Sequence, residues 1–328
     1  MLQRINLVLQ NWMPFLTPIS VLLGVTILSE FSSLSFLVKW IFAFISFASC
    51  IGLKVQDLRQ TLARPMPILV CLFLLQILIP IIAYGVGNLF FSGDIYTITG
   101  LVLAFTIPTG VISLMWVAVF GGNRAVTLAI VLINTILSPI LVPFTLKLLV
   151  GAKVSMDSVG LMNGLLWMIV IPSLLGLFFN KITKEKTKEL AATLAPFSKL
   201  GVMVVIIINS AVVAPYFRDM NFKIILLGIL VFAVACFGYF SGLFVARILK
   251  WDQSVAISLM FNCGMRNNGV GAALAITYFP AAVAFPVVIT IIFQQFLASL
   301  SGKIARSYFD REEKKHKENL NLSVGKSM

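Results

Sequence analysis

The stretch 224-IILLGILVFAVACFGYF-240 contains no charged residue and shows no alternation of polar and apolar residues. A run of this kind predicts a helix that crosses the hydrocarbon core of a bilayer, because a helix satisfies its own backbone hydrogen bonds in lipid. The strands of a membrane β-barrel would alternate instead. Composition agrees: 59% of the 328 residues are hydrophobic, 11% are charged, and the mean hydropathy is +1.02. We therefore expect an all-α membrane protein.

Similar apolar runs, separated by charged or turn-rich breaks, predict ten transmembrane helices. Their expected ranges are 12–30, 35–54, 66–90, 97–120, 124–150, 159–180, 194–216, 222–249, 253–278 and 280–306. Residues 1–306 would form a single transmembrane domain. The remaining residues, 307–328, are charged and poor in apolar side chains, which predicts a disordered cytoplasmic tail.

The basic residues test the helix count independently, since Lys and Arg gather in cytoplasmic loops. With ten helices and both termini cytoplasmic, most of the 25 basic residues fall on the inner side, Lys199 among them. The outer side keeps only Lys39, Lys147, Lys153, Arg218 and Lys223. An odd number of helices would destroy this asymmetry. The net charge of +13 therefore belongs to the loops and the tail, and we expect lipid rather than nucleic acid as the partner of this surface.

The fourth and ninth predicted helices carry related interruptions. The fourth contains 106-TIPTGVISLMWVAVFGGN-123 and the ninth contains 261-FNCGMRNNGVGAALAITYF-279. In an ungapped alignment of the two segments, Pro108 aligns with Asn262 and Gly110 aligns with Gly264. Five helices in each half would give the halves opposite orientations. Matching interruptions in inverted halves predict a transporter site near the middle of the membrane.

Arg266 is the one basic residue expected deep inside a helix. Centring an arginine in the bilayer costs roughly 2.5–3.5 kcal/mol on insertion scales, so its presence suggests a function. The guanidinium keeps its proton and would act as a fixed cation. The alternative is that the side chain reaches an interface. No Asp, Glu or His is expected within a helix, which argues against an intramembrane proton relay.

Several amides and hydroxyls are expected inside the membrane near the two interruptions. They can contact a ligand or only join helices. These residues are Gln76, Thr109, Ser113, Thr127, Asn134, Gln294 and Gln295, together with Asn262, Asn267 and Asn268 around Arg266.

The motif 262-NCGMRNNGVGAALA-275 resembles the crossover segment of the bile acid:sodium symporter family, within a wider group that includes arsenite and auxin-type carriers. Weaker similarities support it. They are 238-GYFSGLFVARILKWDQSVAISL-259, 52-GLKVQDLRQTLARP-65, Gln76 followed by Pro80, and 108-PTGVIS-113 leading to 138-SPILVP-143.

This resemblance implies ten helices in two inverted five-helix repeats, with helices 1, 2, 6 and 7 as a panel and helices 3, 4, 5, 8, 9 and 10 as a core. The fourth and ninth helices would cross where both unwind. It also implies a small organic anion, bile-acid-like or a carboxylate, carried with sodium, and no other cofactor. Mapped residue by residue, one family sodium site falls on Ser113, Leu114, Thr127, Val131 and Asn262. The second falls on Gln76, Asn262 and Arg266 and on the backbone carbonyls of Cys263 and Met265. Substrate contacts fall on Thr109, Ser113, Asn267, Asn268, Gln294 and Gln295.

The sequence departs from the family pattern at the sodium sites. Asn262 stands where both sites share an acidic residue, and Leu114 and Val131 remove further oxygen ligands. We hypothesise that Arg266 replaces bound sodium and that transport depends weakly on sodium. The alternative is that Arg266 points away and one sodium site persists through backbone carbonyls.

Two other functions are weighed against an organic-anion carrier. A membrane enzyme would need a nucleophile with a base or a metal cluster, and neither is visible, since the single histidine, His316, lies in the tail. An arsenite-type metalloid carrier would use the thiol of Cys263. A channel also remains open, although interrupted inverted helices fit alternating access better. Substrate identity, transport direction and oligomeric state stay undetermined.

Overall fold

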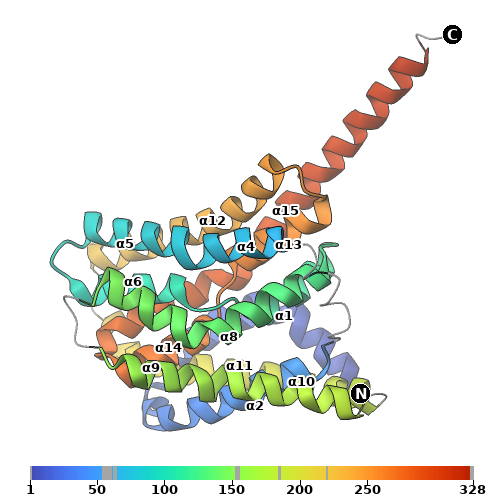
Figure 1. Cartoon of the computed structure of the whole chain (residues 1–328). Helices are drawn as coiled ribbons and strands as arrows, with labels where there is room; N and C mark the ends of the chain where they lie inside the picture. The colour runs from blue at the N-terminus through green and yellow to red at the C-terminus, as the bar shows by residue number, and fades with distance from the viewer. Residues whose placement is uncertain are drawn as a thin grey trace.

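A computed structural model describes residues 2–53, 61, 65–151, 156–183, 186–218 and 221–325, and these residues form helices without strands (Figure 1). The elements are α1 (Leu2–Thr26), the 3-10 helix η1 (Ser29–Leu37), α2 (Val38–Ile51), α4 (Met66–Phe73), the π-helical turn η3 (Leu74–Leu78), α5 (Ile79–Phe90), α6 (Ile95–Thr106), α7 (Ile112–Val119), α8 (Arg124–Leu149), α9 (Ser158–Leu165), the π-helical turn η4 (Leu166–Val170), α10 (Ile171–Thr183), α11 (Lys186–Arg218), α12 (Phe222–Ile248), α13 (Gln253–Gly264), α14 (Asn268–Tyr278) and α15 (Ala281–Gly325).

Among the described residues, eight continuous helical stretches are long and apolar enough to cross a membrane. They are Arg4–Thr26, Ser29–Ile51, Met66–Phe90, Arg124–Leu149, Ser158–Ile182, Glu189–Phe217, Phe222–Ile248 and Ala281–Glu312. Large apolar side chains cover their outer surfaces: Leu89 is 75% exposed and Trp167 is 68% exposed. Such a surface suits lipid rather than water.

The other two expected crossings are broken into short helices. The fourth is divided into α6 and α7, and the ninth into α13 and α14. Pro108 explains the first break, because the residue before a proline avoids helical geometry; Ile107 is extended, with φ −53° and ψ 141°. At the second break the chain leaves the helix at Met265, whose φ is −102° and ψ is 132°. The helix boundaries therefore place a break in each of these two stretches.

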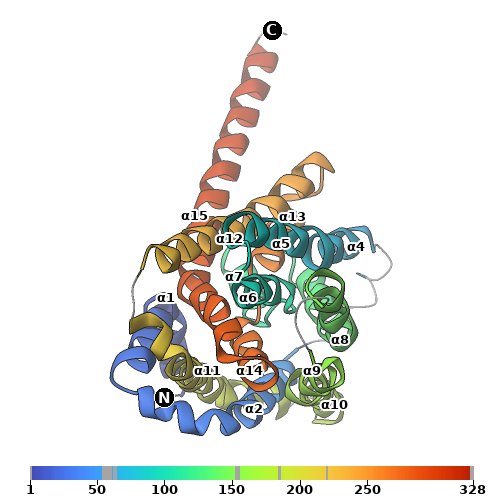
Figure 2. The same ribbon diagram turned by 90° about the vertical axis from the view of Figure 1, so that its left-hand side faces the viewer.

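The helices pack in two groups that the broken helices join. In the first group α1 packs against α11, and α2 packs against α10 and α11. In the second, α12 packs against α13, and α6 packs against α5 and α15 (Figure 2). The helix α14 contacts α15 on one side and α11 on the other. The second break therefore lies at the boundary between the groups.

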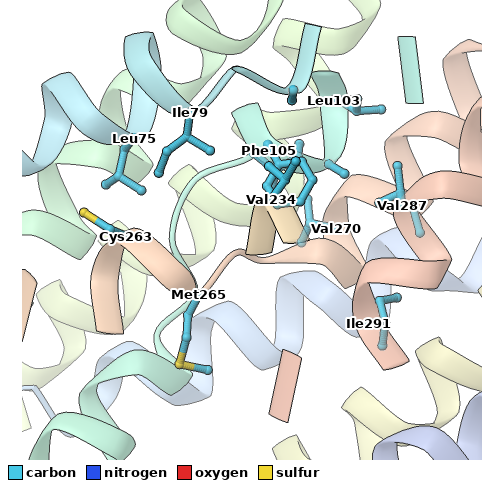
Figure 3. Packing of buried hydrophobic residues seen from close by; sticks show 14 of the residues in the cluster. Leu75, Ile79, Leu103, Phe105, Val234, Cys263, Met265, Val270, Val287 and Ile291 are labelled. Atoms are coloured by element: carbon cyan, nitrogen blue, oxygen red, sulfur yellow. The ribbon is translucent and has the colours of Figure 1, made fainter. Parts of the chain in front are cut away.

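Apolar side chains surround the two breaks and keep them away from lipid. Figure 3 shows Leu75 and Ile79 beside the end of α13, and Phe105, Val234 and Val270 packed together where α6 and α14 approach. All five are buried. These side chains bury part of each interruption in protein, and non-helical backbone is tolerated at membrane depth where it is buried in protein or lines a cavity.

Three helices extend further than the sequence predicts. The helix α1 begins at Leu2 rather than near residue 12, and α11 begins at Lys186 rather than near residue 194. Residues 307–325, expected to be disordered, continue α15 as a helix that projects beyond the other helices (Figure 1). This stretch is rich in Lys and Glu, which favour helix, and has no Gly or Pro before Gly325.

The first turns of the 307–325 extension of α15 also contact the rest of the protein. The side chain of Glu312 accepts hydrogen bonds from Arg247 Nη2 at 2.6 Å and from the Tyr308 hydroxyl at 2.8 Å. The contact with Arg247 joins α15 to the end of α12, and the bond from Tyr308 orients Glu312 within α15.

Asp94 connects α6 to the start of α12. Its Oδ1 accepts a hydrogen bond from Thr97 N at 3.2 Å, and its Oδ2 lies 2.5 Å from Lys223 Nζ. Partial burial raises the pKa of the Asp94 carboxyl, but the contacts with Lys223 and Thr97 lower it by more, so the pKa lies below its ordinary value. The pair therefore contributes stability above the ordinary carboxylate pKa, and this contribution is lost as the pH falls through the lowered pKa.

We expect Asp94→Asn to lower the unfolding free energy at neutral pH by about 0.5–1 kcal/mol, because asparagine retains the helix cap but removes a partly exposed ion pair. The acid-induced loss of thermal stability should become shallower. Thermal unfolding of the purified protein against pH measures both effects. Lys223→Gln should reproduce the neutral-pH loss, and the double variant should lose no more than either single variant; additive losses would contradict the pairing.

Candidate functional site

The two breaks meet through their backbones. Asn267 N donates a hydrogen bond to Pro108 O at 2.9 Å, which joins the extended segment after α13 to the one after α6. Two amides from other helices hold the same region: Gln294 Nε2 of α15 donates to Arg266 O at 2.5 Å, and Asn209 Nδ2 of α11 donates to Gly269 O at 3.0 Å. Side chains therefore satisfy part of the backbone that leaves the helix.

A cavity of about 370 Å³ opens beside this meeting point. Its volume falls within the range of small-molecule sites. Both helix groups contribute to its wall, including α1, α2 and α11 from the first group and α15 from the second. The polar residues on the side of the breaks are Thr109, Arg266, Asn267, Asn268, Gln294 and Gln295.

Five of the six residues expected to contact substrate thus lie at one cavity. The exception is Ser113, which is fully buried and does not line it. Its hydroxyl donates instead to Asn262 Oδ1 at 3.4 Å. Ser113 lies in the first turn of α7, next to the first break, and the sequence cannot tell which side of this helix faces the cavity.

Arg266 is 2% exposed, and among the described residues none of its three guanidinium nitrogens has a hydrogen-bond partner. The hydroxyl of Thr109 and the side-chain oxygen of Asn268 are likewise buried and unpaired in the described part of the chain. Leaving a buried charge unpaired is costly, by several kcal/mol. A fixed cation whose donors remain unused beside a cavity can bind an anion.

Asn262 belongs to both mapped sodium sites, and its side-chain oxygen and nitrogen already form hydrogen bonds with neighbouring groups. Besides accepting from Ser113, its Nδ2 donates to Thr127 Oγ1 at 3.2 Å and to Ser258 O at 2.8 Å. The oxygens of Thr127 and Asn262 are therefore engaged by neutral donors. A cation at the first mapped site would find no negative charge there and would compete with existing hydrogen bonds.

The second mapped site retains one unused acceptor. Gln76 Nε2 donates to Asn134 Oδ1 at 2.7 Å, while Gln76 Oε1 is buried without a partner within the described chain. The side chains of Cys263 and Met265 point in different directions (Figure 3), so only their carbonyls could serve one ion. This site therefore keeps an oxygen ligand for a cation, but it also contains the positive charge of Arg266, which would repel one.

Cys263 has a neighbour that its own segment of sequence does not reveal. The Sγ atom of Cys71 on α4 lies 3.6 Å from the Sγ atom of Cys263, and both thiols are buried. Each cysteine resembles an ordinary small apolar residue when its own helix is taken alone, and only the packing of α4 against α13 brings them together.

Lys199 is a cavity residue that the sequence did not predict. It lies inside α11, is half-buried, and lines the same cavity as Arg266. Its Nζ donates to Asn6 Oδ1 at 2.5 Å, to Asn6 O at 3.1 Å and to Gln10 Oε1 at 3.3 Å. The positive-inside pattern places Lys199 on the cytoplasmic side of a shorter helix, and the predicted first helix begins after Asn6 and Gln10.

Aromatic side chains support the cavity from the side of α7. Trp116 Nε1 donates to Gln295 Oε1 at 3.0 Å and so orients one of the cavity amides. The Trp116 ring stacks on Phe120 and on Phe261, with centroids 6.1 Å and 6.3 Å away. In the described residues no group of three or more His, Cys, Asp or Glu side chains could hold a metal ion.

A sequence model of the sodium bile acid symporter family matches residues 40–219. The protein YbaS of Bacillus subtilis is 47% identical over 88% of this chain and 95% of its own length. YocS of the same organism, named as a sodium-dependent transporter, is 24% identical over 89% of each chain. The probable sodium/metabolite cotransporter BASS1 of Arabidopsis thaliana chloroplasts is 25% identical over 77% of this chain and 63% of its own length.

Proposed function

The chain belongs to the sodium bile acid symporter family, and from this premise we propose that it carries a small organic anion across the membrane by alternating access. Its family makes it an integral, multi-pass membrane protein and a secondary transporter rather than an enzyme. The observation that supports an anionic substrate is the buried, unpaired guanidinium of Arg266 beside the cavity. An anion bound there would offset the cost of burying that charge.

The proposed topology has ten membrane crossings in two inverted five-helix repeats, with both termini cytoplasmic. The fourth and ninth crossings are the broken pairs α6–α7 and α13–α14. The group of α1, α2, α9–α10 and α11 would act as the panel, and the remaining helices as the core. The position of the cavity between these groups supports this division, because movement of one group against the other could expose the site to either side.

We further propose that sodium dependence is weak and that Arg266 takes the place of an ion. The neutral hydrogen bonds around Asn262 support this proposal, because they leave no negative charge at the first mapped site. The names of YocS and BASS1 favour sodium coupling, and the unused Gln76 Oε1 offers an acceptor to such an ion. Sodium is therefore the coupling ion to test. The specific hypothesis is that the charge of Arg266 replaces that of a bound sodium ion.

A metalloid carrier is the second candidate, supported by the approach of Cys71 and Cys263 to 3.6 Å. Two neighbouring thiols are a better match for a thiophilic oxyacid such as arsenite than one thiol alone. Cys263 lies close to Met265 and the unwound segment, but neither cysteine lines the cavity.

Uptake into proteoliposomes tests both candidates. A panel of labelled steroid conjugates, small carboxylates and arsenite would be offered with and without an inward sodium gradient. We expect uptake of at least one organic anion with little change in sodium-free buffer. Strong sodium dependence would contradict the proposal that Arg266 takes the place of a sodium ion. It would not contradict the proposal that the protein is a carrier. Arsenite uptake that disappears in Cys263→Ser, with no organic anion transported, would establish the second candidate instead.

Asn262→Asp should increase the dependence of uptake on sodium. A carboxylate at this position would supply the missing negative charge beside Ser113 and Thr127, and a unit charge about 4 Å from an ion contributes roughly 4 kcal/mol at an effective dielectric constant of about 20. We therefore expect sodium to stimulate uptake at concentrations at least about tenfold lower than in the native protein. Asn88→Asp on α5, outside the cavity, is the control. An unchanged sodium response in Asn262→Asp would count against the mapped site.

A further inference from the structure

Lys199 brings a second positive charge to the cavity. Its three hydrogen-bond acceptors are the neutral oxygens of Asn6 and Gln10. Within the described residues it forms no ion pair, since the pairs there are Lys223–Asp94 and Arg247–Glu312. No Asp or Glu of the described chain lines the cavity either. The ammonium charge therefore faces a cavity whose described wall carries no negative charge.

The face of α11 that contains Lys199 connects it to the breaks. Val202 and Ile206, which follow at helical spacing, line the cavity with apolar side chains. Asn209 continues the same face and donates to Gly269 O at the second break. Lys199 and Asn209 are ten residues apart, or about 15 Å along a helix that rises 1.5 Å per residue. One helix face thus presents a cation at one end, an apolar middle, and the crossover at the other end.

We propose that Lys199 is a second anion-binding residue, and that the transported anion carries a second anionic group, such as another carboxylate, separated from the first by an apolar body. This assignment rests on the proposed function, because it assumes that the cavity holds the substrate. One anionic group would lie near the crossover, where Arg266 supplies positive charge. The apolar body would pack along Val202 and Ile206, and the second group would take the place of a neutral oxygen at the Lys199 ammonium.

A structural role for Lys199 makes a different prediction. If the side chain served only to join α11 to α1, its charge would be irrelevant, and loss of its hydrogen bonds would affect every ligand equally. An anion-binding role predicts instead that its charge discriminates between ligands that differ only in a second charge. The two roles can therefore be separated by a pair of probes and three variants.

The probes are linear α,ω-dicarboxylates of increasing length and their monomethyl esters, titrated into the purified full-length protein by calorimetry. In the native protein we expect a dicarboxylate of suitable length to bind about tenfold or more tightly than its ester, as for a charge-assisted hydrogen bond. Lys199→Gln should reduce this ratio to about one without changing the affinity for the ester. Lys199→Arg, which keeps the charge, and Asn6→Ala, which removes only a neutral partner, should both preserve the preference.

Other results would overturn the assignment. A preference that survives in Lys199→Gln, or an equal loss of affinity for both probes, would show that the charge of Lys199 does not bind the second anionic group. Equal binding of the two probes by the native protein would reject this role alone. Failure of the native protein to bind either probe would also reject this role, whereas the organic-anion function would be rejected only if the uptake panel, with its steroid conjugates, found no transported anion.

Discussion

Arg266→Gln is expected to raise the anion concentration needed for half-maximal uptake by about ten- to a hundredfold. Hydrogen bonds to charged groups contribute roughly 1.5–3 kcal/mol, and each 1.4 kcal/mol corresponds to a factor of about ten in affinity. Glutamine retains polarity but loses the charge and the planar fork of donors. Lysine should restore only part of the affinity, because it lacks that fork. Initial rates of uptake into proteoliposomes measure the change.

The same substitution should make the ligand-free protein more stable. The Arg266 guanidinium is buried and has no partner among the described residues, so a neutral amide removes a desolvation cost. A variant that transports poorly and unfolds at a higher temperature would separate ligand binding from structural damage. Arg247→Gln is the matched control: Arg247 is an exposed arginine paired with Glu312, so its replacement removes no large desolvation cost and should not raise the unfolding temperature. Unchanged uptake in Arg266→Gln would remove the main support for an anion site.

Gly242→Val on α12 should strongly destabilise the folded protein. A Cβ atom at this position would lie 2.5 Å from Leu259 O and 2.7 Å from Leu259 C, both in the backbone of α13. Because a backbone cannot move aside as a flexible side chain can, α12 and α13 would have to separate. We expect a loss of about 3 kcal/mol or more, at the upper end of overpacking effects, together with a lower yield of folded protein.

Gly228→Val on the same helix is the control. A Cβ atom at Gly228 meets nothing within 4 Å, so the larger side chain has room. Thermal unfolding of the two variants in the same detergent compares them directly. Similar unfolding temperatures would show that α12 and α13 are not held as closely as the structure indicates.

The sequence predicted the helical class, the approximate helix positions and both interruptions, because these depend on local properties. Apolar length identifies a crossing, and Pro108 marks a break without reference to any other part of the chain. The cluster of Asn262, Arg266, Asn267 and Asn268 was likewise evident from its position in an apolar segment.

The missing parts of the site depended on contacts between distant segments. Lys199 lies near the start of the predicted helix 194–216 and was counted with the basic residues of the cytoplasmic side, whereas α11 already begins at Lys186. The proximity of Cys71 to Cys263 and the bond between Trp116 and Gln295 each require helices that are far apart in sequence. Of the three α1 residues in the cavity wall, Gln10, Met13 and Thr17, the predicted first helix of 12–30 includes the last two and leaves out Gln10, because it starts too late.

The bond from Asn267 N to Pro108 O has a consequence for how this sequence can change over evolutionary time. If a mutation allowed one interruption to become a regular helix, its backbone group in the bond between Asn267 N and Pro108 O would be moved. The backbone group of the other interruption would then lose its hydrogen-bond partner. The two halves of the gene therefore cannot accumulate changes at these positions independently. A tolerated substitution at one interruption should constrain which residues are acceptable at the other.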